Sequence, residues 1–216
     1  MSERILAADT ALGACSVVIL DGETILAHRC EVMNRGHAEA LAPMVEDAMR
    51  QAELTFAALD RLAVTTGPGT FTGQRVGLAF MRGLRVALNK PLLGVTTLAA
   101  MAAQAMAETN LAMAAALHDA KRDEVYLEIA GAHTREAAVL SLEDAIAELA
   151  KLTGPFALAG TAAPIAAALF PSAVLSDVRQ PDALWVARLA LKMPPSSEPP
   201  KPLYLRAPDA KLPPQP

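Results

Sequence analysis

Residues 65–89 read Thr-Thr-Gly-Pro-Gly-Thr-Phe-Thr-Gly-Gln-Arg-Val-Gly-Leu-Ala-Phe-Met-Arg-Gly-Leu-Arg-Val-Ala-Leu-Asn, and this stretch decides the fold. The apolar segment 62–66 has the composition of a strand and leads into a glycine turn at 67–69. A helix is predicted next, because the hydroxyl of Thr70 or Thr72 can cap its first free amides. Such a turn either holds an anion on those amides or uses glycine only for its backbone geometry.

The predicted helix carries small and apolar side chains over a wide arc, about 220° when each residue advances about 100°. Arg75, Arg82 and Arg85 share the remaining face. Gly73 and Gly77 are one helical turn apart and allow another backbone to approach closely. Because the arc is wider than one face of a sheet requires, we expect this helix to pack on two sides.

Composition narrows the class of protein. The chain has 216 residues, a net charge of −4 and 4% aromatic residues, and no stretch is long and apolar enough for a membrane span. The charge gives no general electrostatic case for nucleic-acid binding, although a local basic patch stays open. No signal-peptide pattern occurs near Met1, so we expect a cytoplasmic protein. Cys15 and Cys30 lie in apolar strand patterns and are expected to be buried free thiols.

Along the chain, two weakly repeated halves are predicted. Residues 5–32 alternate like three antiparallel strands, and 36–51 has helical periodicity despite Pro43. The order of elements, three strands followed by alternating helices and strands, is similar to the ribonuclease-H-like half of the actin-like ATPase superfamily. We therefore expect an α/β fold with two such subdomains, each a mixed sheet flanked by helices. The expected boundaries are 1–98, 99–193 and a Pro-rich tail at 194–216.

Nucleotide contacts are one hypothesis for the ends of these strands. Asp9 follows the first strand and either faces a phosphate-bound cation or bonds the backbone of its own turn. The candidates for nucleotide or phosphate contact are Asp9, Thr10, Gly67, Gly69, Thr70 and Arg75. His37 lies in an apolar helical stripe, as a core histidine or as a contact to a partner. No His-x-x-x-His or His-Glu-x-x-His spacing occurs, so no metal site is predicted.

Several motifs resemble the TsaB family, which is required to make threonylcarbamoyladenosine in bacterial tRNA. The block at 67–89 is one matching piece, its part at 67–77 is the specific one, and the first half matches more closely than the second. The other matching pieces are Ile5-Leu6-Ala7-Ala8-Asp9-Thr10, Cys15-Ser16-Val17, His37-Ala38-Glu39-Ala40-Leu41-Ala42-Pro43-Met44, Gly94-Val95-Thr96-Thr97-Leu98, Asp119-Ala120-Lys121-Arg122-Asp123-Glu124-Val125-Tyr126 and Pro202-Leu203-Tyr204-Leu205-Arg206.

This resemblance implies a non-catalytic paralogue of TsaD, within the glycoprotease-like superfamily. TsaD-like proteins carry a His-x-x-x-His metal pair after the strand that follows the glycine-turn helix, and 96–102 contains no histidine here. The stretch at 118–122, where the superfamily has a second phosphate loop, has no glycine, and Gly160-Thr161 is at best a remnant of an adenosine loop. The resemblance thus implies a scaffold or activating subunit rather than an enzyme.

The implied partners are TsaD in a heterodimer and TsaE in a larger assembly, with tRNA bound mainly through the complex. The isolated chain is expected to form a homodimer through the face that it uses to bind TsaD. No cofactor is expected to bind tightly, and ATP or ADP at the joint with TsaD is left open. The residues expected at the partner interface are His37, Leu41, Met44, Val45, Ala48, Gly73, Gly77, Phe80, Met81 and Leu84.

Two other functions fit the residues less well. One is a stand-alone nucleotide-dependent transferase or kinase of the actin-like class, suggested by Asp9 and the glycine turn. The other is a glycoprotease-like metallopeptidase. The sequence leaves open whether nucleotide binds, what Arg75, Arg82 and Arg85 contact, and whether the homodimer is physiological.

Overall fold

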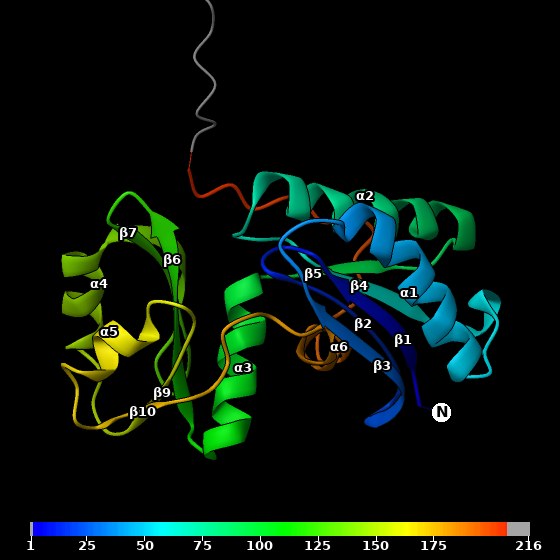
Figure 1. Ribbon diagram of the computed structural model, residues 1–216. Helices are drawn as coiled ribbons and strands as arrows, with labels where there is room; N and C mark the ends of the chain where they lie inside the picture. The colour runs from blue at the N-terminus through cyan, green and yellow to red at the C-terminus, as the bar shows by residue number, and fades with distance from the viewer. Residues whose placement is uncertain (1, 207–216) are drawn as a thin grey trace, which may run out of the picture.

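The computed structural model describes residues 2–206, which form two halves that each contain one five-stranded mixed sheet (Figure 1). The strand orders are β3-β2-β1-β4-β5 and β10-β9-β6-β7-β8. In each sheet the first three strands of the chain are antiparallel to one another. The fourth strand pairs parallel with the first, and the fifth lies parallel on the far side of the fourth. The predicted α/β fold with two repeated actin-like ATPase subdomains is therefore confirmed.

The first sheet contains β1 (Arg4–Asp9), β2 (Ala14–Asp21), β3 (Thr24–Val32), β4 (Arg61–Thr65) and β5 (Leu92–Val95). One face is covered by α1 (His37–Gln51) and α2 (Phe71–Leu88), and a single 3-10 turn, η1 (Phe56–Ala58), connects α1 to β4. Because β1, β4 and β5 are parallel, their carboxyl ends meet at one edge, where ligands bind in open α/β sheets.

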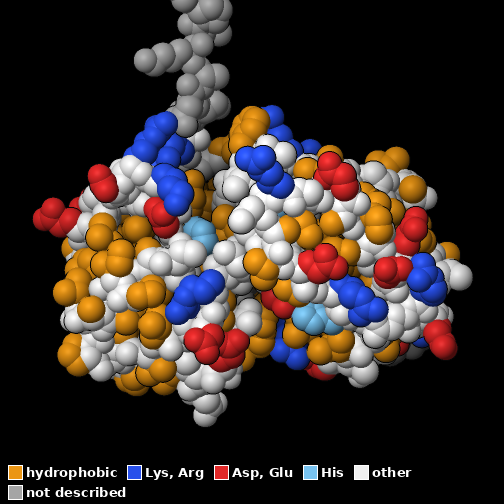
Figure 2. All heavy atoms as spheres, in the orientation of Figure 1, with side chains coloured by type: hydrophobic (Ala, Val, Ile, Leu, Met, Phe, Trp, Pro, Cys, Tyr) orange, Lys and Arg blue, Asp and Glu red, His pale blue; other side chains and the backbone are white. Residues whose placement is uncertain are grey.

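The second sheet contains β6 (Met113–Lys121), β7 (Glu124–Gly131), β8 (Arg135–Ser141), β9 (Phe156–Ala159) and β10 (Ala173–Leu175). Its outer face packs on α4 (Leu142–Leu149) and α5 (Ala163–Ala167). Figure 2 shows many hydrophobic side chains on the surface of this half, at the left of the view.

The remaining two helices lie between the sheets and touch each other. The first, α3 (Thr97–Thr109), follows the first sheet in sequence but packs on the second. The other, α6 (Ala183–Leu191), comes late in the chain but packs on the first sheet, where its alanines meet Ile5 and Ala7. The predicted range 99–193 placed α6 with the second subdomain, and its packing shows that it belongs to the first sheet.

Local sequence signals mark the starts of three helices. The hydroxyls of Thr70, Thr96 and Ser141 each accept a hydrogen bond from the backbone N–H three residues on, at 3.0–3.1 Å. Pro43 stays inside α1, which continues through it. These caps set where α2, α3 and α4 begin.

Three features of the structure were not expected from the sequence. The apolar stretch 162–170 suits a longer helix in the sequence but forms only the five residues of α5, since Pro164 lies in its first turn. The short edge strand β10 was not predicted. Cys30 is exposed because β3 is an edge strand, whereas Cys15 is buried as expected.

Candidate functional site

The carboxyl ends of β1 and β4 bring Asp9 and Thr65 together. The Thr65 hydroxyl donates to Asp9 Oδ1 at 2.6 Å, and the backbone N–H of Ala11 donates to the same oxygen at 3.1 Å. Asp9 is fully buried, and its Oδ2 has no hydrogen-bond partner within residues 2–206. Asp9 therefore bonds the backbone of its own turn, which is one of the two roles predicted from sequence.

Burial raises the pKa of Asp9 to about 7, against the opposing effect of the Thr65 and Ala11 hydrogen bonds. The nearby Asp182 raises this pKa further by charge repulsion. A carboxyl with this pKa is partly protonated at neutral pH.

The predicted glycine turn packs directly on the turn between β1 and β2. The N–H of Thr70 donates to the carbonyl of Ala11 at 2.8 Å, and a Cβ on Gly69 would overlap that carbonyl oxygen. The Thr10 hydroxyl donates to the carbonyl of Gly73 at 2.7 Å. These glycines therefore serve a close contact between two segments of this chain.

Amide groups that would be needed to cradle a phosphate are bonded within the chain. The N–H of Ala11 is held by Asp9, and the N–H of Gly13 donates to Gln180 Oε1 at 2.8 Å. In the second half, the N–H of Asp119 donates to Thr161 Oγ1 at 3.0 Å. As it stands, the turn between β1 and β2 offers few free donors to an anion.

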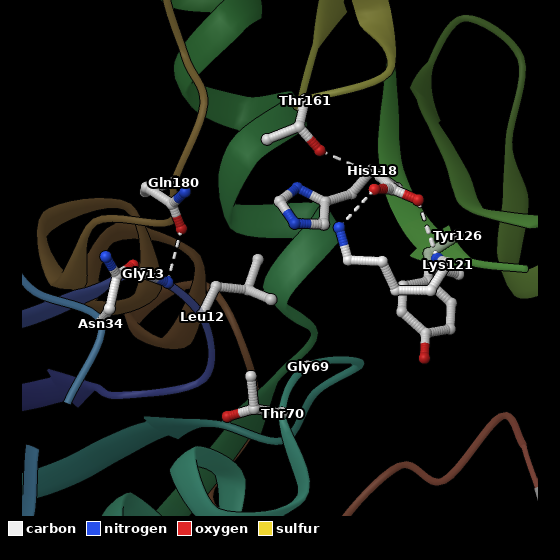
Figure 3. A pocket seen from close by; sticks show the side chains of 12 residues that line it. Leu12, Gly13, Asn34, Gly69, Thr70, His118, Lys121, Tyr126, Thr161 and Gln180 are labelled. Carbon is white, nitrogen blue, oxygen red and sulfur yellow. Dashed lines mark hydrogen bonds and ion pairs between the residues drawn. The ribbon is translucent and has the colours of Figure 1, made fainter.

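A pocket of about 460 Å³ lies between the two halves (Figure 3). Figure 3 shows His118 and Lys121 on the β6 side, facing Leu12 and Thr70 of the first half. Of the predicted nucleotide residues only Gly69 and Thr70 line it. The full lining is Leu12, Gly13, Asn34, Gly69, Thr70, His118, Asp119, Ala120, Lys121, Tyr126, Thr161 and Gln180.

His118 is the buried titratable group of this pocket, and sequence reasoning did not identify it as a site residue. Burial lowers the pKa of His118 to about 4, so its imidazole is neutral at neutral pH. Its Nδ1 has no hydrogen-bond partner within residues 2–206. The ammonium of Lys121 forms an ion pair with Asp119 Oδ2 at 2.6 Å. The positive charge of Lys121 and the negative charge of Asp119, both in this pocket, therefore balance each other. The sequence did not identify His118 as a site residue because it is not part of a His-x-x-x-His or His-Glu-x-x-His motif.

The predicted partner interface lies largely inside this chain's own core. Exposed fractions are 0–6% for Leu41, Met44, Val45, Ala48 and Met81, which pack on the first sheet. These five residues are therefore not a contact surface. The amphipathic pattern that suggested an interface instead arises because α1 and α2 cover one face of the first sheet.

The other predicted interface residues are only partly accessible. His37 Nε2 bonds the carbonyl of Leu12 at 3.0 Å, so its hydrogen bond is satisfied within the chain. Phe80 and Leu84 are half-buried against the same core. A Cβ on Gly77 would lie 2.7 Å from the Thr10 hydroxyl, so the close approach expected at Gly73 and Gly77 occurs within the molecule.

The outward side of α2 does present an apolar surface. Val76 is half-buried, whereas Ala79, Gly83 and Val86 are exposed, Val86 to 76%. These four residues, called here the α2 ridge, repeat at intervals of three, four and three, which is the spacing of a helix-packing seam. A Cβ on Gly83 would meet nothing within 4 Å.

The arginines of α2 hold the C-terminal tail. Arg82 donates to the carbonyl of Pro200, and Arg85 donates to the carbonyl of Ser197 at 2.6 Å. Arg75, a predicted phosphate contact, instead donates to the Tyr204 hydroxyl at 2.9 Å. The tail runs beside α2 and reaches the second half, where Arg206 bonds Glu124 (Figure 1). Residues 202–206 therefore dock on the body of the molecule.

Residues 2–206 contain no group of three or more His, Cys, Asp or Glu side chains placed to hold a metal ion. Over the same residues, no helix has the length and apolar character needed to cross a membrane.

Comparison with known proteins identifies relatives of this chain. A family model described as TsaD, tRNA N6-adenosine threonylcarbamoyltransferase, matches residues 28–180. The tRNA threonylcarbamoyladenosine biosynthesis protein TsaB of Escherichia coli (strain K12) is 38% identical over 123 residues, or 57% of this chain and 53% of that protein. The chain thus aligns with about half the length of this curated relative.

Two solved structures from Pseudomonas aeruginosa cover more of the chain. An uncharacterized protein with similarity to peptidase YeaZ has a TM-score of 0.80 and 32% identity, covering 94% of this chain and all of that one. YeaZ itself has a TM-score of 0.73 and 32% identity, covering 87% and 90%. Both likenesses extend through the two halves.

Proposed function

Because the chain belongs to the TsaB family, we propose that it is a non-catalytic subunit in the synthesis of tRNA threonylcarbamoyladenosine and that it activates TsaD by pairing with it. The family resemblance predicted from the sequence is thereby confirmed. The proposal places the chain in the cytoplasm, with TsaE joining the larger assembly.

A non-catalytic role is supported by the state of the phosphate-binding elements. The amides of Ala11 and Gly13 are bonded to Asp9 and Gln180, and Gly69 packs on the Ala11 carbonyl. An ATPase of this fold needs such donors free for phosphate. This arrangement also counts against a stand-alone nucleotide-dependent transferase or kinase.

The α2 ridge is the observation that carries the pairing proposal. Water-exposed apolar side chains at helix-packing intervals favour a helix of another subunit as the occupant. Gly83 costs about 1 kcal/mol in a helix interior relative to alanine, and the chain's own packing does not require it. A glycine at that position suits close approach of a partner backbone.

Co-purification with TsaD tests the pairing. Gly83→Arg and Val86→Arg each place a charge on the ridge, and both positions are exposed, so the chain should fold normally. We expect either variant to abolish co-purification, since a buried unpaired charge costs several kcal/mol, about 3–5. Ala107→Arg, at an exposed position of α3, is the matched control and should bind like the wild type.

Circular dichroism of each variant checks the fold. Retained binding by both ridge variants would place the interface elsewhere. A Met44→Arg variant would not be informative, because Met44 is 6% exposed and the variant would unfold.

Three finer points stay predictions: the homodimer of the isolated chain, the contact with TsaE, and ATP or ADP at the joint with TsaD. The homodimer would form through the same ridge, so TsaD should displace it. A metallopeptidase activity has no supporting cluster of side chains within residues 2–206.

A further inference from the structure

The region around α2 has a charge pattern that pairing with TsaD does not explain. Residues 61–107 contain five basic side chains and no aspartate or glutamate, although the whole chain has a net charge of −4. Arg61 is paired with Glu3 and buried. The other four, Arg75, Arg82, Arg85 and Lys90, lie on α2 or just after it.

Within residues 2–206, the hydrogen bonds of the three α2 arginines leave their positive charge unneutralised. Arg82 and Arg85 donate to backbone carbonyls of the tail, and Arg75 donates to a phenol hydroxyl. These acceptors are uncharged. The tail therefore orders the guanidinium groups in a row while leaving their charge available to a polyanion.

An exposed aromatic stack stands at the first turn of α2. The rings of Phe71 and Tyr204 lie 5.8 Å apart with 28° between their planes, and the Arg75 guanidinium covers Phe71 at 3.3 Å. Phe71 is 50% exposed and Tyr204 44% exposed, in a chain with few aromatic residues. Three planar groups held together at the surface can be extended by a nucleobase.

A hollow lies at the opposite end of α2. It has a volume of about 480 Å³ and combines two cations with hydroxyl and amide groups, which suits a phosphate. Its lining is Arg85, Val86, Asn89, Lys90, Pro91, Ser196 and Ser197.

We propose that this side of α2 binds single-stranded RNA, with a base stacked on Phe71 and Tyr204 and phosphates along the arginine row to Lys90. The inference rests on the proposed role in tRNA modification and adds a direct contact with the RNA. The 18 residues of α2 rise about 27 Å, which suits roughly four nucleotides, the lower end of known site sizes.

This surface adjoins the α2 ridge and shares Val86 with it, because Val86 also lines the hollow beside Arg85 and Lys90. With about 100° per residue, the arginines and the ridge residues point in directions roughly 90° apart. TsaD on the ridge and RNA on the tail side can therefore bind together. RNA is favoured over an acidic protein because two exposed aromatic rings stand beside the cations.

Fluorescence anisotropy tests the proposal, with a labelled unmodified tRNA transcript and a labelled single-stranded 12-mer RNA. Four phosphate contacts, one for each of the three arginines and Lys90, predict that affinity for the 12-mer falls about 50-fold between 50 and 200 mM salt, a logarithmic slope of about −2.8. Tyr204→Ala should weaken binding about tenfold by loss of one stacked base. Lys90→Glu should weaken binding and reduce the slope by about 0.7.

Lys151→Glu is the matched control, since it makes the same charge change at an exposed position of the second half and should bind RNA like the wild type. Salt-independent binding, or equal affinity in all four proteins, would overturn the proposal. So would Lys90→Glu and Tyr204→Ala variants that lose TsaD but keep RNA, because the surface would then be a protein interface. Gly83→Arg separates the two proposals: it should lose TsaD while the isolated variant keeps its affinity for the 12-mer.

Discussion

Two glycines of α2 should respond to the same substitution with opposite signs. Gly83→Ala adds a methyl group where nothing lies within 4 Å, so only the helix propensity changes, and stability should rise by about 1 kcal/mol. At Gly73 the new Cβ would overlap the Thr10 carbonyl oxygen and lie 2.6 Å from Thr70 Oγ1. Backbone overlap costs about 3 kcal/mol, which leaves a net loss of about 2 kcal/mol after the helix gain.

Thermal unfolding of the isolated chain measures both effects. For a chain of this size we expect the midpoint to rise about 2–4 °C for Gly83→Ala and to fall about 4–8 °C for Gly73→Ala. Denaturant unfolding with an unchanged slope would confirm that stability, and not the denatured state, has changed. Destabilisation by Gly83→Ala, or a neutral Gly73→Ala, would refute the division of α2 into an outward ridge and a face held against Thr10.

Other consequences concern titration, the tail and nucleotide. The pKa of Asp9 is raised to about 7 in the fold, so its contribution to stability is present at low pH and is lost as pH rises from about 4 to 7. The Asp9→Asn variant should not show this loss. The free energy of unfolding, measured across that pH range, tests the expectation. Since the pKa of His118 is lowered to about 4, its contribution is present above pH 6.5 and is lost as pH falls toward 4; His118→Gln should flatten that decline. Arg82→Ala removes the bond to Pro200, so limited proteolysis followed by mass spectrometry should show faster cleavage in 197–206, and an unchanged rate would contradict the tail contact. Calorimetric titration of the isolated chain with ATP and magnesium should show no binding, and micromolar affinity would contradict the assignment of the β1–β2 amides.

The fold was predictable because its signals are local. The glycine turn, the threonine caps and the Asp21-Gly22 hairpin each specify backbone geometry within a few residues, and the structure has all three. What the sequence did not show is how helices exchange between sheets. The alanine-rich α3 and α6 have similar apolar stripes, and only tertiary packing decides which sheet each one covers.

The site was less predictable, because burial and exposure look alike in a helical pattern. The stripe containing Met44 and Val45 suits a partner interface as well as a sheet face, and the structure places it on the sheet. Gly83 carried a better signal, since a glycine with no steric requirement stands inside a helix. The contacts of Arg75 and Arg82 depend on a tail more than 100 residues away, which no local pattern reveals.

Reconstitution of tRNA modification is the direct test of whether this chain activates TsaD by pairing with it. Purified TsaD and TsaE with ATP, threonylcarbamoyl adenylate and unmodified tRNA would be assayed with this chain, without it, and with its Gly83→Arg and Asp9→Asn variants. We expect modification only when the chain can pair with TsaD: the wild type and Asp9→Asn should support it, whereas Gly83→Arg and omission should not. Equal modification without the chain, or modification by the chain without TsaD, would contradict this expectation.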